Sequence, residues 1–169
     1  LLTGKKMIYV CNVDEESAKS GNQYSKKIDA YGLNKEINVI KISASIESQI
    51  SELSDEDRDE YIKSLGLAEP GLNTLINEGY NALDLITYFT SGPKETRAWT
   101  ITMDTLAPES ACIIHTDFEK GFIRAETINY DELINFSNYN EAKDAGKIRL
   151  EGKEYEVKDG DIMNFRFNN

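Results

Sequence analysis

The sequence has few of the residues that bind metal ions or form disulfides: one histidine and two cysteines among 169 residues. The cysteines, Cys11 and Cys112, are far apart in the chain, whereas structural zinc sites need closely spaced Cys and His ligands. A metal site is therefore not expected. Because each cysteine lies within an apolar run, we predict two buried thiols in a reducing compartment.

Long hydrophobic runs and an excess of positive charge are also missing. No apolar stretch approaches the roughly 20 residues of a membrane-spanning helix, and the first residues, Leu1 to Lys6, do not have the pattern of a signal peptide. The 19 basic and 30 acidic side chains give a net charge of −11, which opposes unspecific nucleic-acid binding. We expect a cytoplasmic protein with neither a membrane nor DNA as a partner. Because Leu1 is not a methionine, we expect a cloned piece, a processed product or a fragment.

A phosphate-binding loop of the form Gly-x-x-x-x-Gly-Lys-Ser/Thr is absent. The three Gly-Lys pairs, at Gly4, Gly146 and Gly152, lack the preceding glycine and the following hydroxyl residue. The chain by itself is therefore not expected to transfer phosphoryl groups by the P-loop route.

Cys112 and His115 are three residues apart and raise the question of a thiol nucleophile with a base. Cys112 falls in the apolar run Ala111–Ile114, and no glycine-rich oxyanion loop is nearby. We therefore predict no catalytic residue in this chain. His115 is expected to cap the end of a helix or to anchor a loop.

Strand and helix signals alternate in the first half of the chain. Met7–Cys11 and Asn38–Ile42 are short runs typical of strands buried on both faces of a parallel sheet. A polar helix between them is predicted to end near Tyr31, with Gly32 just past its end. Further helices are predicted around Ile46–Leu53, from Ser54 to Leu65 and from Leu72 to Leu83. This order indicates the back half of a three-layer α/β domain over residues 1–84.

The pattern changes in residues 85–169, which are richer in strand signals. The predicted strands are Ile86–Thr90, Thr96–Thr102, Phe122–Asn129, Ile148–Glu151, Tyr155–Lys158 and Ile162–Phe167. The predicted helices are Pro108–Ile114, Asp131–Phe136 and Glu141–Ala145. The succession of strands and helices suits a ubiquitin-like β-grasp domain.

A short polar motif, Asn12-Val13-Asp14-Glu15, follows the first predicted strand, at the kind of position where open α/β sheets bind ligands. An asparagine amide there can hydrogen-bond a purine nitrogen, and a carboxylate can accept from the amino groups of a base. GTPases have Asn-Lys-x-Asp at this place; here Val13 replaces the lysine and Glu15 the aspartate. Ser43-Ala44, after the next strand, matches their second base-contacting loop. The alternative is an ordinary strand-to-helix turn.

Four basic residues of the second half, Lys94, Arg97, Lys120 and Arg124, could form a small basic rim. Such a rim would give weak, salt-sensitive contact with RNA. The alternative is that these side chains serve only solubility.

Together these motifs resemble the C-terminal part of the YchF family, Obg-related P-loop nucleotide-binding proteins that are also called Obg-like ATPases. The resemblance is carried by Ile8–Glu15, Ile42–Ala44, Leu85–Thr90, Arg97–Thr100, His115–Glu126, Ala145–Lys153 and Asp159–Phe167. The family has a P-loop, switch regions and a helical insertion that are not in this chain.

The resemblance implies the C-terminal half of a Rossmann-like, parallel-sheet G domain over residues 1–84 and a β-grasp TGS domain over 85–169. It implies a preference for ATP over GTP, bound with magnesium in the intact protein. Asn12, Val13 and Glu15 would contact adenine beside Ser43 and Ala44. The TGS domain, with Arg97, Lys120 and Arg124, would contact the ribosome or its RNA in translation or stress control.

Two alternatives to a nucleotide-binding segment remain. The chain could be a TGS module that binds RNA or the ribosome without nucleotide, in which case RNA rather than ATP would perturb its residues. It could also be an independent hydrolase that uses Cys112 and His115, for which Cys112→Ala would have to abolish an activity.

Overall fold

The computed structural model describes residues 4–168, and the chain divides into two compact units, Leu1–Leu83 and Asp84–Asn169, here called unit 1 and unit 2. Unit 1 contains β1 (Ile8–Asn12), the 3-10 helix η2 (Glu15–Ser17), α1 (Gln23–Lys35), β2 (Asn38–Ile42), α2 (Ala44–Glu52), α3 (Asp55–Ser64) and α4 (Gly71–Ala82). Unit 2 contains β3 (Leu85–Ser91), β4 (Thr96–Thr102), α5 (Ala107–Ile114), α6 (Thr116–Lys120), β5 (Phe122–Asn129), α7 (Tyr130–Leu133), α8 (Tyr139–Asp144), β6 (Arg149–Glu151) and β7 (Asp161–Phe167).

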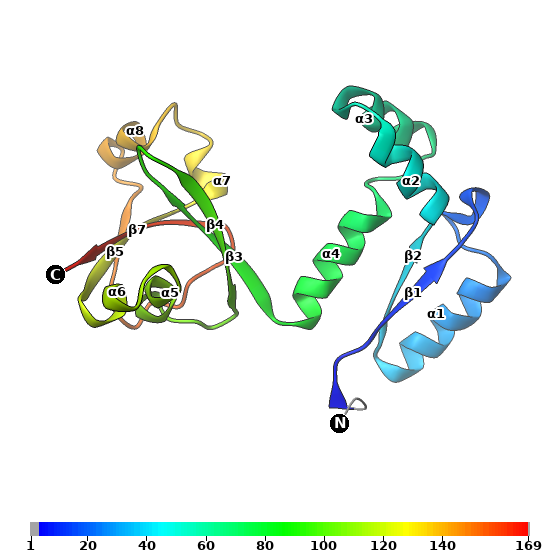
Figure 1. Ribbon diagram of the computed structural model, residues 1–169, viewed down its shortest axis with the longest axis horizontal. Coiled ribbons are helices and arrows are strands. Elements are labelled where there is room, and N and C mark those ends of the chain that lie inside the picture. Colours follow the sequence, from blue (N-terminus) through cyan, green and yellow to red (C-terminus); the bar gives the residue numbers. More distant parts are fainter. Residues whose placement is uncertain (1–3, 169) are drawn as a thin grey trace. The chain divides into compact units, whose positions relative to one another are not determined.

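The sheet of unit 1 is a parallel pair, β1 with β2, in a register that runs from Ile8↔Asn38 to Asn12↔Ile42. Helices α1 and α4 lie along the two sides of this pair (Figure 1). The register brings the carboxyl ends of both strands to one level. The residues that follow Asn12 and Ile42 are therefore neighbours in space.

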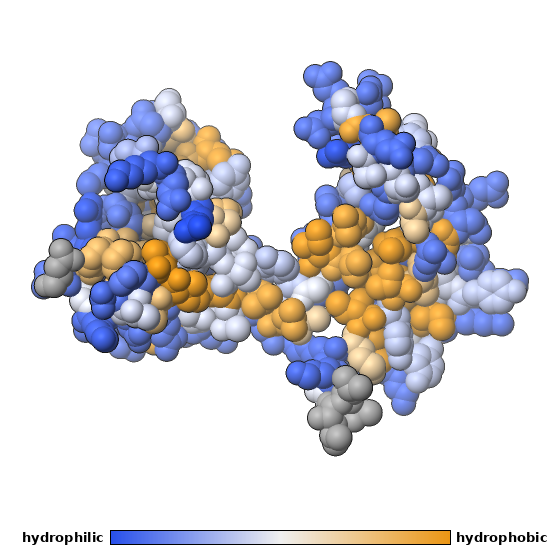
Figure 2. Space-filling view, in the orientation of Figure 1, coloured by the Kyte–Doolittle hydropathy of each residue, from blue (hydrophilic) through white to orange (hydrophobic). Residues whose placement is uncertain are grey.

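The two strands are less buried than their sequences predict. Ile40 is 5% exposed, but Val10 is 42% exposed. Strands covered on both faces need neighbours at both edges and helices on both sides, and the described part of unit 1 supplies only two strands. Figure 2 shows apolar residues gathered over α4 and the adjacent strands on its visible face.

Helix α1 extends one turn beyond its predicted end. Gly32 is buried inside the helix, close to Val39 and the backbone of Ile37, rather than just past the end. The true stop is Glu36, which takes the left-handed conformation at φ 56°. The Ile37 N–H then donates to the Gly32 carbonyl at 2.9 Å, which closes the helix as a glycine would. The prediction was wrong because Gly32, which has no Cβ, allows Val39 and Ile37 to pack closely against the helix.

The remaining helices of unit 1 pack around a small apolar cluster. Ile46 and Ile50 of α2 and Ile62 of α3 are its buried members. Ser54 caps α3 by accepting a hydrogen bond from the Asp57 N–H at 3.3 Å, as its sequence predicts.

Unit 2 is built on a five-stranded mixed sheet in the order β4-β3-β7-β5-β6. Its first and last strands, β3 and β7, pair in parallel at Phe89↔Ile162, and the other neighbouring pairs are antiparallel. Helix α5 contributes Ala107 and Ala111 to the core on one face of the sheet. The fully buried Tyr88 donates its hydroxyl to the Ser110 carbonyl at 2.8 Å, and burial raises its pKa.

One predicted strand of unit 2, Tyr155–Lys158, is not a strand. Glu156 forms a single isolated bridge with Leu106, and the Val157 N–H donates to the Thr105 carbonyl at 3.0 Å. The segment therefore pairs with the chain that leads into α5 instead of with the sheet. The helix predicted over Asp131–Phe136 begins earlier and is shorter, as α7. Helix α6 was not predicted from the sequence.

In the part of the chain that the structure describes, no helix is both long and apolar enough to cross a membrane.

Candidate functional site

The motif at the end of β1 is joined to the loop at the end of β2 by a side chain. The exposed Asn12 accepts a hydrogen bond through its Oδ1 from the Ala44 N–H at 3.1 Å. Ala44 is the first residue of α2, so its N–H is one of those that the helix itself leaves without a partner. Asn12 thus joins the two loops, and this contact does not use its amide nitrogen, a double donor.

Glu15 is held beside this loop by residues of α2. Its Oε1 accepts from the Ser45 hydroxyl at 2.9 Å and from the Gln49 side-chain amide at 3.0 Å. Gln49 in turn accepts a hydrogen bond from the Tyr61 hydroxyl. A carboxylate has lone pairs for about four hydrogen bonds, so Oε2 can still accept from a ligand. Ser45 and Gln49 lie four residues apart and so share one helix face. The sequence shows this spacing, but not that the shared face meets Glu15.

Val13 and Ser43 lie behind the exposed side chains. Val13 is 8% exposed, and its N–H donates to the Ile42 carbonyl at 2.8 Å. Ser43 is 3% exposed, and its hydroxyl lies 3.2 Å from that of Ser45. The structure therefore brings the five predicted site residues together, but it turns the Val13 side chain inward.

Asp14, between Val13 and Glu15, serves the local turn. Its carboxylate accepts from the Ser17 N–H at 2.9 Å at the start of η2. Hydrogen bonding by Ser17 lowers the pKa of Asp14, which therefore stays ionised at neutral pH. The motif thus adds a second negative charge close to Glu15.

The candidate site is an exposed surface rather than a closed pocket. A cavity of about 220 Å³ in unit 1 reaches Ser43, but Asn12 and Glu15 do not line it. Among the described residues no group of three or more His, Cys, Asp and Glu side chains is placed to hold a metal ion.

Cys112 and His115 do not form an activated pair. The hydrogen bond with Glu119, together with burial, raises the pKa of the Cys112 thiol, which is the opposite of activation. His115 ends α5 and caps α6 by accepting from the Asp117 N–H at 3.2 Å. Cys11 and Cys112 are both half-buried, so the prediction of two buried thiols was wrong.

The basic residues of unit 2 do not form one rim. Arg97 stacks over the Trp99 ring at 4.8 Å, on the sheet face that carries the buried Ile101. Arg124 alternates with the buried Ala125 and therefore lies on the other face, opposite Arg166 on β7. Lys120 is the last residue of α6. Arg97 and Arg124 therefore lie on opposite faces of the sheet.

One family model matches residues 85–168, under the description "YchF-GTPase_C: Protein of unknown function (DUF933)". Curated relatives named "Ribosome-binding ATPase YchF" are 50% identical over 99% of this chain, in Haemophilus influenzae over 167 residues and in Bacillus subtilis over 170. These matches cover 46% of each relative, so the chain spans about half of their length.

Two solved structures resemble this chain. The YchF GTPase of Schizosaccharomyces pombe matches 98% of the chain with a TM-score of 0.87 and 37% identity, over 44% of its own length. A GTP-binding protein of Pyrococcus horikoshii matches 96% of the chain and 46% of itself with a TM-score of 0.66, but at 17% identity it supports the fold alone.

Proposed function

The chain belongs to the YchF family. From this we propose that unit 1 supplies base recognition in an ATP-binding domain. The observation that carries the proposal is the hydrogen bond from the Ala44 N–H to Asn12 Oδ1. It joins the two loops at the carboxyl ends of parallel strands, where α/β sheets bind nucleotides.

The exposed atoms at these loops suit adenine. The Asn12 amide nitrogen can donate to a ring nitrogen of the base, because its oxygen is already engaged by Ala44. Glu15 Oε2 can accept from the exocyclic amino group of adenine, while Oε1 is held by Ser45 and Gln49. Val13 and Ser43 would support the loops from behind.

The same carboxylate disfavours guanine when it faces the position of the base that carries the amino group of adenine. An ionised carboxylate only accepts hydrogen bonds, and guanine presents an oxygen acceptor where adenine has its amino group. Two acceptors facing each other leave both without a donor, which makes this pairing unfavourable. We therefore propose ATP rather than GTP as the preferred nucleotide, with magnesium, in the intact protein.

We further propose that unit 2 is a β-grasp domain of the TGS type. Its support is the sheet in which the first and last strands are central, parallel neighbours, with α5 packed on one face. Because relatives are named ribosome-binding, we propose the ribosome as the partner of this unit, and accordingly a cytoplasmic location.

The test is a titration of ATP and then GTP, with magnesium, into isotope-labelled chain, with backbone amide shifts as the readout. Shifts confined to Asn12–Glu15 and Ser43–Ser45, larger with ATP, would support the proposal. No shift there with either nucleotide, or larger shifts with GTP, would contradict it.

A matched variant separates binding from loop structure. Asn12→Asp keeps an oxygen that can accept from the Ala44 N–H but removes the amide donor. We expect the amide shifts of Ala44 and Ser45 in the free chain to change little, and the shifts caused by ATP to be lost.

The second candidate function, an RNA- or ribosome-binding module without nucleotide, has one observation in its favour. Arg97 is stacked on the Trp99 ring at 4.8 Å, an arrangement that single-stranded nucleic acids can use for stacking. This candidate predicts that a short oligouridylate shifts the amides of Arg97 and Trp99, while ATP leaves Asn12 and Ser43 unchanged.

A further inference from the structure

We propose that unit 2 binds a short extended peptide along the free edge of β7, with a bulky apolar side chain of the peptide inserted in a neighbouring pocket. The proposed function assigns no role to this place. The inference concerns unit 2 alone and does not depend on the adenine site.

The free edge follows from the strand register. Strands β3 and β7 are parallel neighbours through the pair Phe89↔Ile162, so the last residue of β3, Ser91, reaches the level of Asn164. Strand β7 continues to Phe167. Its other edge is paired with β5 as far as Phe122↔Phe167. The final residues of β7 thus have a strand on one side only, within the described part of unit 2.

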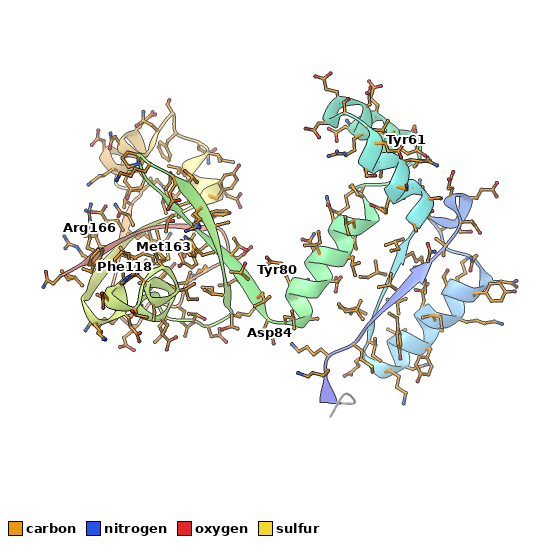
Figure 3. All side chains as sticks on the ribbon, viewed as in Figure 1. Tyr61, Tyr80, Asp84, Phe118, Met163 and Arg166 are labelled. Carbon is orange, nitrogen blue, oxygen red and sulfur yellow. The ribbon has the colours of Figure 1, made fainter. Side chains whose placement is uncertain are left out.

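A pocket of about 440 Å³ lies between this part of β7 and the turn that follows β3. Its volume falls within the range of about 300–1,000 Å³ that is common for ligand sites. The apolar walls are formed by Trp99, Ile114, Phe118, Met163, Phe165 and Phe167. In Figure 3, Phe118 of α6 and Met163 of β7 lie near each other in unit 2.

The aromatic walls are fixed in place before any ligand binds. Phe118 stacks on Phe167 with a centroid distance of 3.9 Å and an interplanar angle of 26°. The Trp99 N–H donates to the Thr90 hydroxyl at 2.9 Å, so the indole turns carbon surface toward the pocket. Such walls favour an aliphatic or aromatic side chain over a polar one.

An extended peptide satisfies both features at once. Its main chain can pair with the unpaired edge of β7, and because strand side chains alternate, one of them is directed toward the pocket. An exposed strand edge is otherwise a liability that folded proteins cover or blunt.

The charges favour a peptide over RNA. Residues 85–169 carry 10 basic and 15 acidic side chains, which repel a polyanion. At the pocket rim the charges of Lys94 and Glu95 balance. A peptide of low net charge therefore fits better than a nucleic-acid strand.

The experiment uses the isotope-labelled chain and three capped pentapeptides, Thr-Val-Phe-Val-Thr and its versions with Leu or Asp at the centre. We expect the Phe and Leu peptides, but not the Asp peptide, to shift the amides of Ser91–Glu95 and Asn164–Phe167. A Phe peptide that is N-methylated at every residue keeps the side chain but cannot pair through its main chain, and it should fail to bind.

Two pairs of variants locate the site. Phe118→Ala removes a pocket wall and should weaken binding of the Phe peptide about tenfold. Tyr130 is an exposed aromatic residue of α7 outside the pocket, so Tyr130→Ala should leave binding unchanged. If Phe118→Ala does not fold, Ser91→Trp places a large side chain at the exposed rim, with Ala98→Trp on β4 as its control. Only the rim variant should block binding.

Three results would overturn the proposal. The first is that neither apolar peptide shifts the amides of Ser91–Glu95 or Asn164–Phe167. The second is that the N-methylated peptide binds as tightly as the unmethylated Phe peptide. The third is that a short oligouridylate shifts these amides and the peptides do not. None of these results would bear on the response of Asn12 and Ser43 to ATP.

Discussion

Glu15 is the side chain on which base selectivity should depend. Replacing it by Gln keeps the length and most of the packing against Ser45 and Gln49, but adds a donor that guanine can accept from. We expect Glu15→Gln to weaken ATP binding about fivefold to tenfold and to narrow the preference for ATP over GTP. Calorimetric titration of both nucleotides checks this, with Glu16→Gln as a neighbouring control. An unchanged ATP-to-GTP ratio would remove Glu15 from base recognition.

Glu126 should make unit 2 sensitive to acid. Burial raises the pKa of this carboxyl, but the hydrogen bond and the charge of Arg166, 3.1 Å away, together with the charge of Lys143 and the hydrogen bond of Tyr139, bring it below its usual value. A lowered folded pKa means stability that is present above the unfolded pKa and lost as the pH falls through the folded value. We expect the free energy of unfolding to fall below about pH 4.5.

The matching variant is Glu126→Gln, which removes the titrating group and keeps the shape. Urea unfolding between pH 3 and 6, read from amides of β5 and β7, should show a shallower acid slope in the variant. An identical slope in both proteins would assign the acid sensitivity to other carboxyls.

At the level of whole helices and strands, the end of α1 offers a stabilising change. Glu36 adopts a left-handed backbone at φ 56° that a glycine adopts without strain. We expect Glu36→Gly to raise the stability of unit 1 by about 0.5–1 kcal/mol. Thermal unfolding followed by circular dichroism measures it, and a loss of stability would show that the Glu36 side chain matters more than its backbone.

The junction of α6 and β5 offers the opposite change. A Cβ on Gly121 would overlap the backbone of Asn168, whose N–H donates to the Gly121 carbonyl at 2.9 Å. Gly121→Ala should therefore separate the last residues of β7 from β5 and destabilise unit 2 by about 1–3 kcal/mol. Gly152, where a Cβ meets nothing within 4 Å, is the control position, and equal unfolding midpoints would argue against this close contact.

Particular strands and helix ends show where sequence patterns were sufficient to predict the fold and where they were not. Thr96–Thr102 and Phe122–Asn129 were predicted with the bounds that the structure gives, because runs of β-branched and aromatic residues ended at clear turn signals. Gly32 was misread because a glycine can end a helix or allow close packing, and only the neighbouring strand decides which. Tyr155–Lys158 has strand-like residues, but its pairing partner is remote in the chain.

The candidate base site was predictable in part for a similar reason. Strand ends mark where Asn12 and Ser43 fall, since parallel strands bring their carboxyl ends to one edge. The roles of Ser45 and Gln49 depend on how α2 leaves that edge, which local sequence does not determine. Likewise, side chains alternate between the two faces of β4 and of β5, but the sequence does not show which face packs on the core. The structure is needed to place Arg97 and Arg124 on opposite faces of the sheet.

Considered as a whole, the molecule is strongly acidic, with a net charge of −11 and a pI of about 4.6. Like charges keep the copies of the chain apart in solution, and this repulsion vanishes at the pI. We expect solubility at low salt to reach its minimum near pH 4.6 and to recover on either side. Light scattering across a pH series checks this, and a minimum displaced toward neutral pH would point to attraction through apolar surface instead.

The parallel contact between β3 and β7 also has a consequence for synthesis. The strand at the centre of the sheet of unit 2 is the last of its strands to be made, and it separates β3 from β5. Until Asp161–Phe167 has emerged from the ribosome, the two halves of this sheet have no strand between them. We therefore expect unit 2 to complete its fold only late in translation, through contacts between its most distant segments, which are slow to form. A protein proposed to work at the ribosome would thus acquire its partner-binding unit only as synthesis of that unit ends.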